Sequence, residues 1–202
     1  MIIQGTPEWF EARRGKVTAS MVAAVIAKTK SGPSASRATY MGQLIAENLT
    51  GNVQESFSNA AMQWGTDTEP QARLSYEFEH GVEVIEEGFV IHPTILGSGA
   101  SPDGLVGSKG MVEIKCTNTS THIDTLLKKK VPSKHNTQMQ WQMACCEREW
   151  TDFVSYDPRL PPHLHMFCTR VERDDKYINE LESEVEIFIA EMASIIEELE
   201  KL

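Results

Sequence analysis

Cysteines are few in this sequence, and long apolar runs are missing. The four cysteines include one adjacent pair but no Cys-x-x-Cys motif. We therefore expect no zinc site, no iron–sulfur cluster and no disulfide scaffold. No stretch approaches the roughly 18 apolar residues of a transmembrane helix. The first ten residues also lack the basic start and the apolar run of a signal peptide. We therefore expect a cytoplasmic protein without a membrane segment.

Strong compositional bias is also absent. The chain has 202 residues, of which 41% are hydrophobic and 24% are charged. A chain of this length can bury roughly 70% of its unfolded surface without help from disulfides or a structural metal. No repeat or linker divides it, so we expect one domain spanning residues 1–202.

The net charge of −10 on its own disfavours a nucleic-acid partner. The charge is uneven, however: residues 174–202 hold 10 acidic and 2 basic residues, which leaves only −2 for the first 173. Within those, residues 109–135 hold six lysines against two acidic residues. The sign of the total charge therefore does not exclude DNA.

Helical and strand patterns alternate along the chain, which predicts a mixed α/β fold. A glycine at position 51 marks the end of one helix, and β-branched, alternating residues start after Gly81. Polar loops are expected at 30–36 and 52–59. Helices are expected at 7–14, 18–28, 37–48, 60–64, 68–79, 119–129 and 134–146, and strands at 82–92, 96–101, 105–106, 111–117, 150–156 and 164–172.

The C-terminal helix shows the clearest periodicity. Apolar residues from Ile178 to Leu202 recur at alternating steps of three and four. This pattern fits an oligomer interface, and it fits equally an amphipathic helix that packs on its own sheet with an acidic face in water. About three heptads are too short to decide for a coiled coil.

The strongest local motif is Ser-Pro-Asp-Gly-Leu at 101–105, followed by Glu-Ile-Lys at 113–115. Residues two apart on a strand share a face, so Glu113 and Lys115 point one way and Ile114 points into apolar packing. A hairpin of this length can bring Asp103 beside Glu113. The pattern therefore predicts a core on one face of the strand and a polar site on the other.

Two converging carboxylates and a backbone carbonyl, such as that of Ile114, form the all-oxygen site that Mg²⁺ or Mn²⁺ prefers. Lys115 beside that ion can orient and help deprotonate an attacking water, or stabilise charge on a phosphate. These parts suit phosphodiester hydrolysis. The alternative is a surface Glu and Lys on a half-buried strand with an unrelated turn aspartate.

Taken together, six motifs resemble the YqaJ-like phage recombination exonucleases typified by lambda exonuclease, within the PD-(D/E)xK nuclease superfamily. The resemblance spans nearly the whole chain and implies a restriction-endonuclease-like core, with a central mixed sheet flanked by helices. The motifs are Trp9 with Arg-Arg-Gly-Lys-Val-Thr-Ala-Ser at 13–20, Trp-Gly-Thr-Asp-Thr-Glu at 64–69, the two motifs above, Gln-Met-Gln at 138–140 and Tyr-Asp-Pro-Arg at 156–159.

The resemblance implies roles for several residues. Asp103, Glu113 and the Ile114 carbonyl would bind two Mg²⁺ ions, with Mn²⁺ as a substitute, and Lys115 would assist the attacking water. Glu69 and Gln138 would complete the site. Arg13 and Ser20 match positions that hold the 5′ phosphate of the degraded strand, which suits an arginine fork and the first turn of a helix.

Each of these residues also has a structural interpretation. Ser20 can be a helix cap and Arg13 a surface charge. Thr66 and Glu69 have the spacing of a capping box, although Pro70 lacks the N–H that the Thr66 carbonyl would need, which moves the helix start toward Asp67. Without the resemblance, Gln138 is a surface residue.

DNA contacts beyond the site are also expected. Met62 occupies a position where similar nucleases have an apolar residue, and we interpret it as a wedge that separates the two strands, or else as a core methionine. The lysine patch, which is Lys128, Lys129, Lys130 and Lys134, is interpreted as contacting the DNA backbone rather than as a solvated loop.

The resemblance implies a Mg²⁺-dependent 5′-to-3′ exonuclease that digests one strand of linear duplex DNA to mononucleotides and leaves a 3′ tail for recombination. It further implies a ring-shaped homotrimer, a single-strand annealing protein as partner, and a phage or prophage origin in a bacterial cell. The alternatives are an endonuclease or repair nuclease on the same core, and a DNA-end binding module that has lost catalysis.

Overall fold

The structure is a computed structural model that describes residues 2–30, 32–53 and 59–202. The polar loop expected at 52–59 lies mostly outside the described residues. The helices are α1 Pro7–Arg13, η1 Ala19–Met21, α2 Val22–Val25, α3 Ala35–Thr50, α4 Ala60–His80, α5 Thr119–Lys128, α6 Ser133–Cys146, η2 Pro162–Leu164 and α7 Asp175–Leu199. The strands are β1 Val17–Thr18, β2 Lys28–Thr29, β3 Gly32–Pro33, β4 Val84–Ile85, β5 Val90–Ile91, β6 Ser98–Ala100, β7 Gly104–Val106, β8 Gly110–Lys115, β9 Trp150–Tyr156 and β10 Met166–Glu172.

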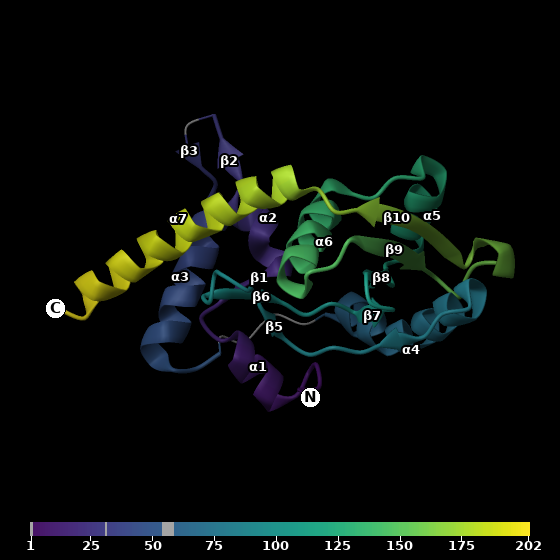
Figure 1. Cartoon of the computed structure of the whole chain (residues 1–202), viewed down its shortest axis with the longest axis horizontal. Helices are drawn as coiled ribbons and strands as arrows, with labels where there is room; N and C mark the ends of the chain where they lie inside the picture. Colours follow the sequence, from purple (N-terminus) through teal and green to yellow (C-terminus); the bar gives the residue numbers. More distant parts are fainter. Residues whose placement is uncertain (1, 31, 54–58) are drawn as a thin grey trace.

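A five-stranded sheet, in the order β10-β9-β8-β7-β4, forms one half of the molecule (Figure 1). The central strand β8 runs parallel to β9, whereas the other neighbours are antiparallel. Ala72 and Tyr76 of α4 pack with Val112 and Ile114 against one face. Contacts from α5 and α6 cover the other face, where His122 meets Ser155 and Gln138 meets Glu113. The sheet is therefore mixed and flanked by helices, which confirms the predicted α/β class.

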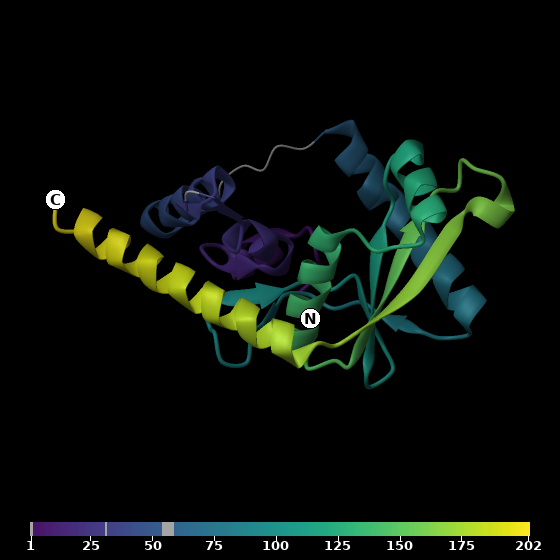
Figure 2. The same ribbon diagram turned by 90° about the horizontal axis from the view of Figure 1, so that it is seen from above.

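A second core lies beside this sheet and is mainly helical. The short sheet β1-β6-β5 and helices α2, α3, α6 and α7 surround it, as the view from above shows (Figure 2). Trp141 on α6 is fully buried there. Because α6 contributes Trp141 to this core and Gln138 to the sheet face, it connects the two halves of the fold.

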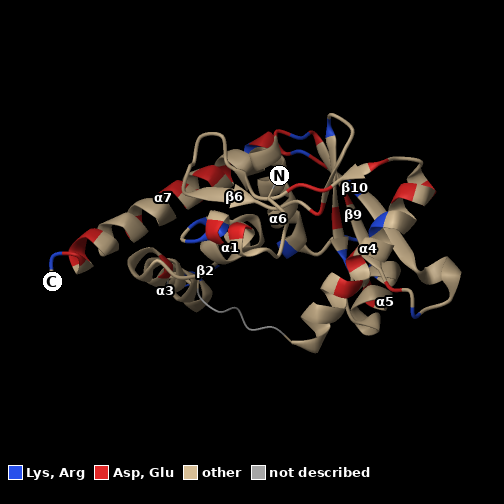
Figure 3. Ribbon diagram, turned by 90° about the horizontal axis from the view of Figure 1, so that it is seen from below, with Lys and Arg blue, Asp and Glu red and all other residues tan. Residues whose placement is uncertain are grey.

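The C-terminal helix packs on its own chain. Leu181, Val185 and Phe188 are buried in the second core with residues of α2, α3 and α6, so its partners are mainly helices rather than the expected sheet. Beyond Met192 the helix extends past the body, and Leu199 and Leu202 are exposed (Figure 1). Acidic residues gather along it, as predicted (Figure 3).

One helix replaces the two that were predicted around Thr66. α4 runs unbroken from Ala60 to His80 with Pro70 inside it, so the expected start near Asp67 is wrong. The Asn59 side chain accepts the first N–H groups of the helix, and the Thr66 hydroxyl donates back to the Met62 carbonyl instead of capping. Burial of one face on the sheet offsets the single backbone hydrogen bond that the proline removes.

Three further boundaries differ from the sequence prediction. The helix expected at 18–28 is only a 3₁₀ turn and one α-turn, followed by the β2–β3 hairpin. The strand expected at 82–92 is two short strands in different sheets, interrupted at Gly88, where any Cβ would lie 2.3 Å from the Ile2 carbonyl oxygen. The strand expected at 164–172 begins only at Met166, because Pro162–Leu164 form a 3₁₀ turn.

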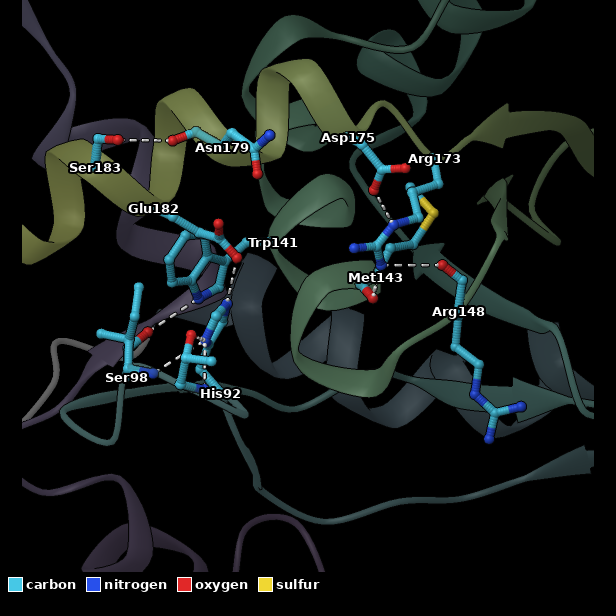
Figure 4. A network of polar contacts seen from close by, with 12 residues as sticks. His92, Ser98, Trp141, Met143, Arg148, Arg173, Asp175, Asn179, Glu182 and Ser183 are labelled. Atoms are coloured by element: carbon cyan, nitrogen blue, oxygen red, sulfur yellow. Dashed lines mark hydrogen bonds and ion pairs between the residues drawn. The ribbon is translucent and has the colours of Figure 1, made fainter.

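A buried polar network fastens α7 to the rest of the molecule (Figure 4). His92 stacks on Trp141, and its Nδ1 accepts hydrogen bonds from the backbone N–H groups of Thr94 and Ile95. This leaves the proton on Nε2, which lies 3.2 Å from Glu182 Oε1 on α7. Neutral histidine therefore fits its surroundings.

Acidification is expected to loosen this attachment. Burial lowers the pKa of His92, and the positive charge of Arg173 adds to this effect. The negative charges of Glu182 and Glu186 oppose it. A depressed histidine pKa stabilises the fold above the unfolded value of about 6.5, and that stabilisation is lost as the pH falls through the folded value. We expect His92→Gln to flatten the acid limb of a melting-temperature profile between pH 7 and pH 5. An unchanged acid limb would contradict this role.

Candidate active site

Asp103 sits at the start of the β7–β8 hairpin. Gly104 pairs with Val112 across the hairpin, so Asp103 lies opposite Glu113 in the register. Its Oδ2 accepts a hydrogen bond of 2.7 Å from the backbone N–H of Ile114. The predicted convergence of Asp103 with the Glu113–Lys115 segment is therefore present.

Pro102 precedes Asp103 and has no backbone N–H to offer the Ile114 carbonyl. Continuing the β7–β8 register, which ends at Gly104 and Val112, would bring Pro102 opposite Ile114. In an antiparallel pair, the N–H and C=O of one residue point to the same neighbouring strand. The Ile114 carbonyl thus points to the same side as the Ile114 N–H, which donates to Asp103. Pro102 offers no backbone N–H to this carbonyl.

Glu113 is fully buried and is held by three side chains. Its Oε1 accepts from Gln138 Nε2 at 2.6 Å, and its Oε2 accepts from Gln142 Nε2 at 2.7 Å. Lys115 forms an ion pair with Oε1. The two glutamines lie one helical turn apart on α6, so one helix face fixes the orientation of the carboxylate.

Lys115 is the cation of this cluster. Burial alone would lower its pKa, but the negative charges of Glu113 and Asp103 outweigh burial and raise the pKa above its ordinary value. Burial and then the charge of Glu113 raise the pKa of Asp103 well above its usual range. The buried Glu113 and the half-buried Asp103 beside one ammonium leave an excess of negative charge, which favours a bound cation.

Glu69 approaches the cluster from α4. Its carboxylate accepts from Arg73 Nη2 at 3.0 Å, one turn along the helix, and Arg73 also pairs with Glu86. Burial raises the pKa of Glu69, against the opposing effects of Arg73 and Lys115. Glu69 is therefore a partner of Arg73 within the electrostatic reach of Lys115, rather than a helix cap.

A cleft of about 380 Å³ holds the residues predicted to bind the DNA end. Arg13, Ser20 and Met62 all line it, together with Trp9, Thr18 and Tyr40. The Arg13 guanidinium stacks 3.9 Å from the Trp9 ring centre, and burial lowers its pKa. Ser20 is exposed within the 3₁₀ turn η1, and Met62 is exposed in the first turn of α4. Met62 is therefore not a core methionine.

Ser101 joins this cleft to the carboxylates. Its hydroxyl oxygen accepts from Trp9 Nε1 at 2.9 Å and from Arg13 Nη1 at 3.3 Å. Asp103 follows two residues later, a span of about 7 Å in extended chain. The predicted phosphate anchor and the predicted metal site thus lie next to each other.

The lysine patch stands apart from these contacts. Lys128 forms an ion pair of 2.7 Å with Asp124, and both side chains are exposed. Lys129 ends α5 in the left-handed conformation. Lys134 lies beside His135, whose pKa is lowered to about 4 by burial and then by Lys115 and Lys134. Contact of this patch with DNA stays a prediction.

Four partners of the site were not predicted as site residues: Ser101, Gln142, Arg73 and His135. Gln142 shares the helix face of Gln138, and Arg73 follows Glu69 by four residues, so helical spacing was a usable signal for both. The hydrogen bonds from Trp9 and Arg13 to Ser101 join segments about 90 residues apart, and no local pattern indicates them.

The residues present fit a divalent metal ion. Asp103, Glu113 and the Ile114 carbonyl would supply oxygen ligands for it, beside an excess of negative charge. Among residues 2–30, 32–53 and 59–202, no group of three or more His, Cys, Asp or Glu side chains is placed to hold a metal. The candidate ligand set therefore depends on the backbone carbonyl.

Comparison with known proteins identifies the family of the chain. Residues 8–149 match the model of the YqaJ-like viral recombinase domain. The chain belongs to this family. A comparison with curated proteins finds no match.

Solved structures support the same assignment. An alkaline exonuclease (LHK-Exo) from Laribacter hongkongensis is 56% identical, with a TM-score of 0.91 and 97% of each chain covered. The same enzyme in complex with dAMP gives 55% identity and the same TM-score and coverage. A phage-related exonuclease from Haemophilus somnus 129PT is 17% identical with a TM-score of 0.75, covering 91% of this chain and 96% of its own, and shows the shared fold.

In the part of the chain that the structure describes, no helix is long and apolar enough to cross a membrane.

Proposed function

We propose that this protein is a Mg²⁺-dependent exonuclease that digests one strand of linear duplex DNA from its 5′ end and leaves a 3′ single-stranded tail. The observation that supports this most strongly is the bridge at Ser101. It places a cleft that suits a terminal phosphate next to paired carboxylates and a lysine. An endonuclease needs no such anchor beside its cleavage site.

The roles of the residues follow from their chemistry. Arg13 and Ser20 hold the 5′ phosphate, since an arginine fork and a hydroxyl both donate to phosphate oxygens. Asp103, Glu113 and the Ile114 carbonyl would hold Mg²⁺, which when bound supplies positive charge to activate water and to stabilise the phosphate, with two ions per site and Mn²⁺ as a substitute. Glu69 and Gln138 complete the site, the first through charge and the second by orienting Glu113.

Lys115 is best suited to orienting water and stabilising phosphate charge. Its raised pKa keeps the ammonium protonated at neutral pH, so it donates hydrogen bonds rather than accepting a proton. Attack of water on the phosphorus breaks the bond to the 3′ oxygen of the terminal nucleotide and releases a 5′ mononucleotide. The relative crystallised with dAMP, a deoxynucleoside monophosphate, supports this product class.

A three-substrate comparison tests the proposal. Linear duplex DNA with a 5′ phosphate, the same duplex with a 5′ hydroxyl, and closed circular DNA are each incubated with Mg²⁺ or EDTA. We expect digestion of linear DNA only, faster with the phosphate and absent in EDTA, and Arg13→Gln should remove the preference for the phosphate. Cleavage of closed circles would replace this proposal with an endonuclease.

Met62 gives a separate prediction about strand separation. Its exposed side chain lines the anchor cleft, so we expect it to wedge the duplex end apart. Met62→Ala should slow digestion of duplex ends several-fold while leaving digestion of single-stranded DNA unchanged. The control is Leu74→Ala, another exposed apolar residue on α4 that does not line this cleft. Equal effects on both substrates would exclude a wedge.

Assembly and partners are proposed from the family resemblance. A ring-shaped homotrimer around DNA would keep the enzyme on its substrate, and a single-strand annealing protein would take up the 3′ tail. Sedimentation measures the first, and co-purification with a phage-encoded annealing protein measures the second. A monomer at micromolar concentration would contradict the ring.

A further inference from the structure

Arg159 is held more rigidly than its exposure suggests. Its Nε and Nη2 donate to the two carboxylate oxygens of Asp157 at 2.7 and 2.9 Å, and Nη2 also donates to the Thr117 carbonyl at 3.0 Å. The guanidinium stacks 4.2 Å from the ring centre of Trp64. The side chain is nevertheless 42% exposed, whereas Asp157 is fully buried.

This arrangement lies at the carboxyl end of β8, the strand that carries Glu113 and Lys115. Thr117 follows Lys115 by two residues, and Trp64 follows Met62 by two residues in α4. A Cβ added at Gly65 would lie 3.5 Å from the Cys116 carbonyl, so α4 passes directly over the end of β8. The parallel strands β8 and β9 both end here, with Lys115 beside Ser155 in the register. Ligands of sheets with parallel strands commonly bind at this edge.

Part of the donor capacity is unused. Within the described residues, Arg159 Nη1 has no hydrogen-bond partner, and Trp64 Nε1 is buried without one. Burial alone would raise the pKa of Asp157, but hydrogen bonds from Arg159 lower it to about 2, so the carboxylate stays ionised and keeps the guanidinium in place. A guanidinium fixed in advance loses little conformational entropy when it binds an anion.

We propose that Arg159, stacked on Trp64, is a further phosphate-binding residue that contacts the DNA backbone beside the cleavage site. This rests on the proposed function, because the phosphate is that of the DNA being digested. It differs from the anchor at Arg13: the two arginines are held by different elements, one through Ser101 before β7 and the other through Thr117 after β8. Because β7 and β8 are antiparallel, both of these contacts lie at the same end of the β7–β8 hairpin, so two separate arginines would hold the DNA backbone at that end.

The salt dependence of binding separates a phosphate contact from a structural ion pair. Each phosphate contact adds about 0.9 to the slope of log affinity against log salt for duplex DNA. We expect Arg159→Gln to reduce this slope by about one for a 5′-phosphorylated duplex, measured in EDTA between 50 and 200 mM salt. Lys109→Gln removes the same charge from an exposed ion pair with Glu149 at the opposite end of β8, and should leave the slope unchanged.

A second variant distinguishes a lost phosphate contact from a loss of folding. Arg159→Lys keeps the charge but cannot reproduce the paired hydrogen bonds to Asp157, so we expect the wild-type slope together with a lower melting temperature. An unchanged slope in Arg159→Gln, or an equal reduction in Lys109→Gln, would overturn the inference. Digestion by the wild type with Mg²⁺ is measured in parallel. If the wild type digests linear duplex DNA and the slope does not change, the inference about Arg159 fails and the proposed function stands.

Discussion

Replacing Lys115 with methionine is expected to reduce digestion of linear duplex DNA by about 10²–10⁴-fold, the range typical of losing a positioned catalytic group. Binding of a 5′-phosphorylated end should persist, because Arg13 and Ser20 line the adjacent cleft and Lys115 does not. The measurement is a single-turnover rate together with an end-binding affinity for each variant.

The control for this variant is Lys109→Met, which removes an exposed lysine from the turn that precedes the same strand. It should retain the wild-type rate. If Lys115→Met kept more than about a tenth of the wild-type rate, Lys115 would not be part of the catalytic group, and the assignment of β8 as the catalytic strand would lose its main support.

Replacing Asp103 with asparagine is expected to abolish digestion and at the same time to stabilise the protein in EDTA. Asparagine can still accept the Ile114 N–H, so the hairpin is retained. Burial and the charge of Glu113 raise the pKa of Asp103, which means that its ionised form is unfavourable in the folded state. Removing that charge should raise the melting temperature by about 2–4 °C for each kcal/mol gained.

The pH dependence gives the sign of this effect. A carboxyl whose folded pKa is raised stabilises the fold below its unfolded value of about 4, and this contribution is lost as the pH rises through the folded value. The gain from Asp103→Asn should therefore be present at pH 7 and vanish near pH 4. A lower melting temperature at pH 7 would show that Asp103 is a structural residue rather than a strained functional one.

The alternation around Glu113 was readable from the sequence because it depends only on the geometry of one strand. Val112 and Ile114 are buried against α4, whereas Glu113 and Lys115 share the opposite face with α6. The convergence of Asp103 with Glu113 was readable as well, because it depends only on the length of one hairpin. The register of β7 and β8 confirms it, although Gly104 lies in β7 rather than in a turn.

The course of α4 was not readable in this way. Pro70 and the Thr66–Glu69 spacing are local signals for a helix start, and tertiary packing of Ala72 and Tyr76 overrode them. The pair of glutamines that binds Glu113 was predictable only in part. Helical spacing places Gln142 on the same face as Gln138, but it does not indicate that either contacts β8. The bridge at Ser101 depends entirely on how the chain folds back on itself.

The central claim is the direction of digestion, and end-labelled DNA tests it most directly. A linear duplex with a 5′ phosphate is labelled on one strand, either at the 5′ end or at the 3′ end, and digested with Mg²⁺. The account predicts that the 5′ label appears at once as a mononucleotide while the 3′ label stays in long DNA until late in the reaction. Early release of the 3′ label as mononucleotide would contradict it.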